Sequence, residues 1–166
     1  MKKILLILLL TTPFIGFGQG WEKTFGGVFL EWGFSVQQTN DGGYIICGET
    51  NSFGNNTMDI YFIKTDGNGD SVWTKTFGNN WDIFDGRSVQ QTNDGGYIIT
   101  GVLGGVPNSF GLIKTNNNGD SLWTKIYGNG YGQSVQQTTD GGYIITGNVG
   151  SNSNSFGLIK TNNNGD

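Results

Sequence analysis

Carboxylates and aromatic side chains gather in the segments that differ most between three near-copies of one repeat. Asp82 and Asp85 lie close together in the second of these segments. Two carboxyl groups on either side of a glycosidic bond are the groups that a glycan-active hydrolase needs. Aromatic rings beside carboxylates also suit carbohydrate or peptide binding without turnover. The candidate ligand-binding residues are Glu31, Trp32, Trp81, Asp82, Asp85, Arg87 and Tyr131.

Most other catalytic groups are missing from the sequence. The chain has no histidine, which excludes Ser-His-Asp and Cys-His groupings and the usual zinc sites. The run Asp66–Asp70 places oxygen ligands at alternate positions, but Ser71 stands where a calcium loop needs glycine. Turn formation explains this run without an ion. We therefore assign no catalytic residue, no metal site and no cofactor, and we favour a binding or structural module over an enzyme.

A repeat of about 50 residues positions the candidate residues. Residues 35–46 recur unchanged as residues 88–99 and nearly unchanged as residues 134–145. Each copy divides into four strands, A to D, in which A reads S-V-Q-Q-T and B begins Y-I-I. Gly-containing turns join A to B and C to D, as tight hairpins require. The D–A and B–C connections vary between copies and carry the candidate residues.

The repeat predicts an all-β fold, a partial β-propeller of about three four-stranded antiparallel blades after a signal peptide, because propeller blades recur at this period. We expect a strand D at 21–26, blades at 35–78 and 88–128, and an incomplete blade at 134–166. Propellers close with typically four to eight blades. We therefore expect the chain to be a fragment that lacks further blades or a sorting domain. The alternative is strand exchange between copies, in which the N-terminal strand of one copy completes the last blade of another.

The first 18 residues have the pattern of a signal peptide. Lys2 and Lys3 precede an apolar run, and Gly16 and Gly18 supply small residues at the −3 and −1 positions of a cleavage site. The apolar run is shorter than the ~20 residues of a spanning helix. We expect export, a mature chain at 19–166, and a secreted or outer-surface location with no membrane-spanning segment.

Charge and repeated single residues narrow the partners and the structural roles. The net charge of −4 disfavours nucleic-acid binding. Cys47 occupies a position that threonine fills in the other copies, which predicts a small buried residue. Trp73 and Trp123 recur at one strand position, which predicts that they dock one blade on the next. Lys64, Lys114 and Lys160 recur likewise and are expected to be structural or solvated.

The segment Lys64–Trp73 resembles the strand C–turn–strand D signature of quinoprotein-like β-propeller repeats. The whole unit over residues 21–166 also resembles D-G-G-Y repeats of surface-exported bacterial proteins, often those that leave by the type IX route. This resemblance implies a propeller fold and an exported binding or structural module. No cofactor-binding residue of quinoprotein dehydrogenases can be placed here. The expected partner is carbohydrate or protein at the face formed by the D–A and B–C loops.

Overall fold

The computed structural model describes residues 20–54, 57–79, 82, 84–105, 108–150 and 155–166. All regular structure within these residues is β-strand, which confirms the all-β class. The strands are β1 (Glu31–Gln38), β2 (Tyr44–Thr50), β3 (Asp59–Thr65), β4 (Ser71–Phe77), β5 (Phe84–Gln91), β6 (Tyr97–Leu103), β7 (Ser109–Thr115), β8 (Ser121–Gln137), β9 (Tyr143–Val149) and β10 (Ser155–Thr161).

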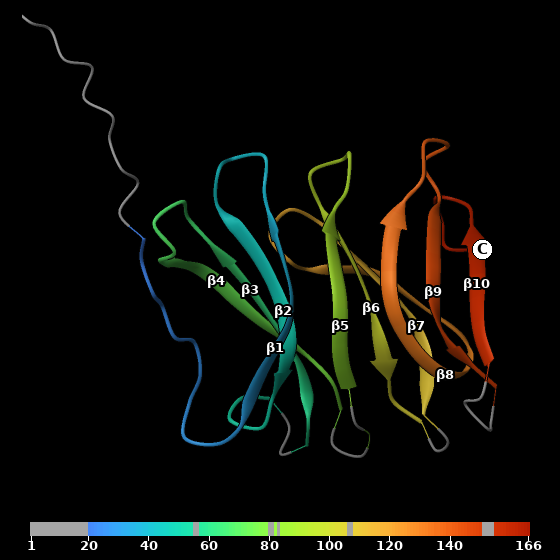
Figure 1. Cartoon of the computed structure of the whole chain (residues 1–166), viewed down its shortest axis with the longest axis horizontal. Helices are drawn as coiled ribbons and strands as arrows, with labels where there is room; N and C mark the ends of the chain where they lie inside the picture. The colour runs from blue at the N-terminus through green and yellow to red at the C-terminus, as the bar shows by residue number, and fades with distance from the viewer. Residues whose placement is uncertain (1–19, 55–56, 80–81, 83, 106–107, 151–154) are drawn as a thin grey trace, which may run out of the picture.

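Hydrogen bonding groups these strands into two antiparallel sheets. Strands β1 to β4 form a four-stranded sheet in sequence order, and β5 to β10 form a six-stranded sheet. The larger sheet has two arms, because residues 121–129 of β8 pair with β7 and residues 130–137 pair with β9. We call β1–β4 the first sheet, β5–β7 with residues 121–129 the middle arm, and residues 130–137 with β9 and β10 the last arm. Figure 1 shows the three in a row, with β10 at the end opposite to the first sheet.

The expected set of separate four-stranded blades is wrong for the described residues. The predicted connection Gly128–Gln133 is part of β8, so the last strand of one copy continues into the first strand of the next. Gly128 and Gly130 have φ angles of 134° and 138°. Glycine adopts such angles without the steric cost that other residues meet. The short connection therefore bends as one strand, and the second sheet joins two copies.

The predicted strand at 21–26 is also wrong, because no described residue before Glu31 belongs to a strand. A strand needs a hydrogen-bonding neighbour. The described part of the chain offers these residues no neighbouring strand. They lie instead beside the first sheet, as the blue segment in Figure 1 shows.

Two apolar clusters hold the three units together. The first joins Ile45, Cys47 and Phe62 of the first sheet to Val89 and Ile99 of the middle arm. The second joins the middle arm to the last arm through Ile98, Leu112, Val135, Tyr143 and Ile145. Burial of such side chains stabilises the fold by about 1.5–3 kcal/mol each. Cys47 is fully buried and unpaired, as its repeat position predicts.

Candidate functional site

A Trp–Tyr contact recurs three times: it docks the N-terminal segment on the first sheet, the first sheet on the middle arm, and the middle arm on the last arm. The rings stand edge-on, with centroids 5.7, 6.0 and 5.9 Å apart, in the pairs Trp21–Tyr44, Trp73–Tyr97 and Trp123–Tyr143. Each Trp ring also lies against a turn glycine, where an added Cβ would collide with it, at Gly69, Gly119 and Gly165. The docking role predicted for Trp73 and Trp123 is confirmed.

Ion pairs repeat at the same junctions. A lysine two residues after each Trp pairs with an aspartate in the next turn, in the pairs Lys23–Asp70, Lys75–Asp120 and Lys125–Asp166. A second lysine in each copy pairs with the aspartate of the D-G-G turn, as Lys64–Asp41, Lys114–Asp94 and Lys160–Asp140. Its Nζ also donates to a threonine backbone carbonyl. Of the two predicted alternatives, structural or solvated, the structure supports a structural role for Lys64 and Lys114, whereas Lys160 makes the same contacts and is partly solvated.

The first strands of successive copies are joined by side-chain hydrogen bonds. Gln37 Oε1 accepts the backbone N–H of Gln91 at 2.6 Å, and Gln90 Oε1 accepts that of Gln137 at 2.6 Å. Ser35 Oγ accepts the N–H of Val89 at 3.2 Å, and Ser88 Oγ accepts that of Val135 at 3.3 Å. These bonds fix the register between the first strands of successive units.

This register brings the end of β2 against the beginning of β5. A Cβ added to Gly86 would meet Ile60, Gly48 and Cys47, and the Cys47 thiol donates to the Gly86 carbonyl at 3.3 Å. The neighbours of these residues are Glu49 and Asp85, which are both buried. The junction therefore places two carboxyl groups from different sheets beside each other.

An arginine and two aromatic rings complete this cluster, which we call the rim cluster and define as Trp32, Phe34, Glu49, Asp85 and Arg87. The Arg87 guanidinium pairs with Asp85 Oδ2 and lies 4.4 Å from the Phe34 ring centroid. Phe34 meets Trp32 edge-on at 6.4 Å. Trp32 is 54% exposed and lies opposite Glu49 in the β1–β2 ladder. The cluster therefore runs from a solvent-exposed indole to a buried carboxylate.

Burial controls the electrostatics of the rim cluster. Desolvation raises the pKa of Asp85, although the hydrogen bond and charge of Arg87 lower it in part. Desolvation, and then the charge of Asp85, raises the pKa of Glu49. Among the described residues Asp85 Oδ1 has no hydrogen-bond partner. Burial of an unpaired carboxylate oxygen is costly, because the atom loses its hydrogen bonds to water and gains none from the described residues.

The structure brings three of the predicted residues, Trp32, Asp85 and Arg87, into one cluster, and they lie in strands rather than in the predicted loops. Glu31 instead accepts hydrogen bonds from Gly27 N and Thr50 Oγ1 and holds the turn before β1.

The remaining predicted residues are placed differently. Asp82 exchanges two hydrogen bonds of 2.9 Å with Asn79, so the predicted Asp82–Asp85 pair is replaced by Glu49–Asp85. Tyr131 lies in β8 and accepts a hydrogen bond from Asn108. Trp81 lies outside the described residues.

Sequence reasoning missed Glu49 and Phe34. The equivalents of Glu49 in the other copies are Val102 and Asn148, so a single charged residue in an otherwise apolar strand was the available signal. Phe34 has Arg87 as its equivalent in the next copy, and the contact between these two could not be read from either copy alone.

The calcium-like run forms a turn closed by its own first side chain. Asp66 Oδ1 accepts the backbone N–H groups of Asn68 and Asp70, each at 2.9 Å. Asn116 and Asn162 do the same in the other copies, which explains why Asp and Asn interchange at this position. Within the described ranges, no group of three or more Cys, Asp or Glu residues is placed to hold a metal ion.

Comparisons with known proteins return no family. No protein-family model matches the chain, and no curated protein matches it. In the part of the chain that the structure describes, no helix has the length and apolar character needed to cross a membrane.

Proposed function

We propose that this chain is an exported β-propeller repeat module, built from part of a ring of blades, that binds carbohydrate at the rim cluster. The proposal for the fold is supported by the junctions: successive units dock through the same Trp–Tyr and Lys–Asp contacts. Repetition of one interface is what a stack of blades requires. The D-G-G-Y repeat resemblance points in the same direction.

The observation that carries the binding proposal is that one cluster holds both the unpaired Asp85 Oδ1 and the exposed Trp32 ring, joined through Phe34 and Arg87. Sugar hydroxyls are donors that a buried carboxylate oxygen can accept, and an exposed indole offers a flat apolar surface to a sugar ring. Arg87 donates to Asp85 Oδ2, so Oδ1 is the oxygen that still lacks a donor among the described residues. Because surrounding residues bury Oδ1, a sugar hydroxyl reaches it only when the rim cluster opens. The partner expected at the D–A and B–C face is therefore assigned to the rim cluster. Protein remains the second partner class.

Binding of purified glycans to the chain, measured by glycan array and then by calorimetry, tests this proposal. We expect Trp32→Ala and Asp85→Asn each to weaken binding at least tenfold. The matched control is Asp66→Asn, which removes one charge from a turn in which the other copies already carry Asn. Glycan binding that survives both site variants, or no glycan binding by the wild-type chain, would refute the assignment.

A second candidate function is glycoside hydrolysis by the Glu49–Asp85 pair. It is favoured by the position of two buried carboxyl groups from different sheets beside each other, where burial raises the pKa of both. A carboxyl with a raised pKa can act as the acid beside an ionised partner. Turnover of a bound glycan, lost in both Glu49→Gln and Asp85→Asn while binding persists, would establish the enzyme. Binding without turnover would support the module.

Export is the remaining part of the proposal, and residues 1–18 lie outside the described part of the chain. Small residues up to Gly18 place the cleavage before Gln19. Mass spectrometry of protein recovered from the medium or the cell surface should give a chain that begins at or near Gln19. Recovery only inside cells with Met1 retained would contradict it.

A further inference from the structure

The solvent-facing side of the first sheet lacks the neighbouring sheet that covers the equivalent face of the middle arm. Val36 is 64% exposed, whereas Val89, at the same repeat position, is 5% exposed because the first sheet covers it. Gly33 gives the same result. A Cβ added to Gly33 would meet nothing within 4 Å, whereas one added to Gly132 would lie 2.2 Å from Thr100 Oγ1 of the preceding unit.

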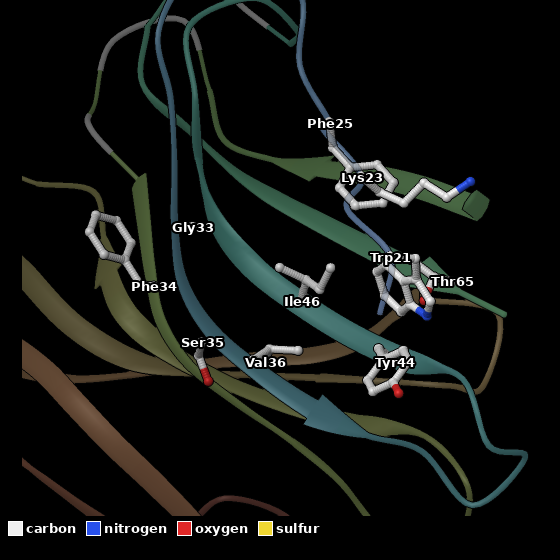
Figure 2. Close-up of a pocket in the computed structure, with 10 residues that line it drawn as sticks. All are labelled: Trp21, Lys23, Phe25, Gly33, Phe34, Ser35, Val36, Tyr44, Ile46 and Thr65. Atoms are coloured by element: carbon white, nitrogen blue, oxygen red, sulfur yellow. The ribbon is translucent and has the colours of Figure 1, made fainter. Parts of the chain in front are cut away.

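A cavity of about 550 Å³ marks this uncovered face (Figure 2). It is lined by Trp21, Phe25, Phe34, Val36, Tyr44 and Ile46. At the next junction, the positions equivalent to Trp21, Val36, Tyr44 and Ile46 are Trp73, Val89, Tyr97 and Ile99. That place is filled there by the first-sheet side chains Ile45, Cys47 and Phe62. The cavity therefore lies where a preceding sheet would place its apolar side chains.

The last arm, at the opposite end of the molecule, carries side chains of the kind that fill the equivalent cavity at the internal junctions. Leu158 of β10 is 69% exposed, although its equivalents Phe62 and Leu112 are fully buried by the next unit. Lys160 shows the same difference: its side chain is 42% exposed, whereas those of Lys64 and Lys114 are 7% and 5% exposed. The last arm therefore exposes the face that, in the first sheet and the middle arm, packs against the next unit.

We propose that a second copy of this chain docks head to tail, with its first sheet against the last arm. Ser134 Oγ and Gln136 Oε1 then accept the N–H groups of Val36 and Gln38 in the second copy, as Ser35 and Gln37 do within the chain. Leu158 enters the cavity beside Val36. The docked copy also covers Trp32, whose repeat equivalent Asp85 is buried at the internal junction, so docking and glycan binding at Trp32 exclude each other. The partner is assigned by this match between two faces, each of which has its complement elsewhere in the same molecule.

The segment Trp21–Gly26 of the second copy completes the last arm. Trp21 and Lys23 already dock on their own first sheet through Tyr44 and Asp70, as strand β4 docks on the middle arm. The segment belongs to no strand, and β10 is the edge strand of its sheet. Lys64 pairs with Trp73, and Lys114 with Trp123, in the internal ladders. The expected register between copies therefore sets Lys160 opposite Trp21.

The area is sufficient for a dimer in which both ends are used. A face of four strands about 4.8 Å apart and about 17 Å long covers roughly 300 Å². Two junctions with two such faces each bury roughly 1,200 Å², which is the lower limit for stable interfaces. Three units from each of two copies also give a blade number within the usual four to eight. This closure into a ring rests on the proposed propeller form, whereas the docking of two faces does not.

Sedimentation velocity on the mature chain at increasing concentration tests the proposal, with a mass of two copies as the expected result. Val36→Glu and Leu158→Glu should each abolish association and melt at the temperature of the wild type diluted to a monomer, because both side chains are exposed in the single chain. Asn117→Glu, in an exposed turn, is the matched control and should associate as the wild type does.

Mixing the two variants distinguishes head-to-tail docking from any other contact. The Val36→Glu chain keeps an intact last arm and the Leu158→Glu chain keeps an intact first sheet. Each alone should be monomeric, and an equal mixture, which keeps one intact junction of roughly 600 Å², should form a one-to-one dimer weaker than that of the wild type. A monomeric wild type, association that survives both substitutions, or a mixture that associates no more than either variant alone at the highest concentration would each overturn the proposal. The first result would assign the two faces to further repeats in the same polypeptide rather than to a second copy.

Discussion

Trp73 stands edge-on to Tyr97 with ring centroids 6.0 Å apart, so a side chain of β4 packs on a strand of the next sheet. The pair Trp123–Tyr143 repeats this geometry at 5.9 Å. The two junctions share ion pairs and hydrogen bonds as well, and the repeated sequence is therefore a repeated interface. In such an array the interfaces between units contribute to stability together with the units themselves.

Removal of one docking ring tests this dependence. We expect Trp123→Ala to lower the free energy of unfolding by about 3–5 kcal/mol, because the ring packs against the cluster that joins the middle and last arms. Trp32→Ala is the control, since its ring is mostly exposed, and should cost less than about 1 kcal/mol. Urea denaturation measures both. Equal losses for the two variants would mean that the docking ring carries no special weight.

Acid should destabilise the fold through the D-G-G turns. The hydroxyl of Thr39, and then Lys64, lowers the pKa of Asp41 to about 2 from the ordinary value of 3.8. A carboxyl with a lowered pKa in the folded state contributes stability above its unfolded pKa, and this contribution is lost as the pH falls through the folded pKa. The loss attributable to Asp41 should therefore lie between about pH 4 and pH 2.

Denaturation curves at several pH values measure this loss, and Asp41→Asn should reduce it. Thr39→Val provides an independent variant, because it should raise the pKa of Asp41 in an NMR titration while the lysine stays in place. An acid dependence that is identical in wild type and Asp41→Asn would contradict the assignment.

Glu49 should behave in the opposite way. Because burial raises the pKa of Glu49, its ionised form opposes folding at neutral pH, and Glu49→Gln should raise the free energy of unfolding there. The difference should vanish below the unfolded pKa of a glutamate, where both states bind the proton. Urea denaturation at neutral and acidic pH measures it. Destabilisation at neutral pH would show that the glutamate is held by favourable contacts.

Calcium should have no effect on stability. Asp66 closes its turn by accepting two backbone N–H groups, and Asn does so equally well in the other copies. We expect Asp66→Asn to be neutral and Asp66→Ala to cost about 1–3 kcal/mol. Chelator should leave the melting temperature of the wild type unchanged. A drop with chelator that calcium reverses would show that the turn binds an ion.

The sequence was most informative where the copies agree. Identical turns predicted where strands begin and end, and the fixed positions of Trp73 and Lys64 predicted structural roles, because equal residues in equal places meet equal surroundings. The strand at 21–26 could not be judged in this way, because a strand depends on a partner chain segment as well as on its own residues. The fusion of two strands into β8 depends on the φ angles of Gly128 and Gly130, which composition does not set.

The rim cluster was predicted only in part because it forms between copies. Asp85 and Arg87 could be recognised as unusual within their own copy, but their contacts with Glu49 and Phe34 cross from one sheet to another. Those contacts depend on the register between the two sheets. That register is set by Gln37 and Ser35, which look like ordinary polar strand residues in the sequence.

Amide hydrogen exchange at three equivalent glutamines tests the stacked arrangement most directly. The backbone N–H groups of Gln91 and Gln137 donate to Gln37 and Gln90 of the preceding copy, whereas Gln38 has no preceding copy in the chain. The measurement is made by NMR on Leu158→Glu, so that a second chain does not cover Gln38. Stacking predicts slow exchange at Gln91 and Gln137 and fast exchange at Gln38. Equal exchange at all three amides would contradict the account.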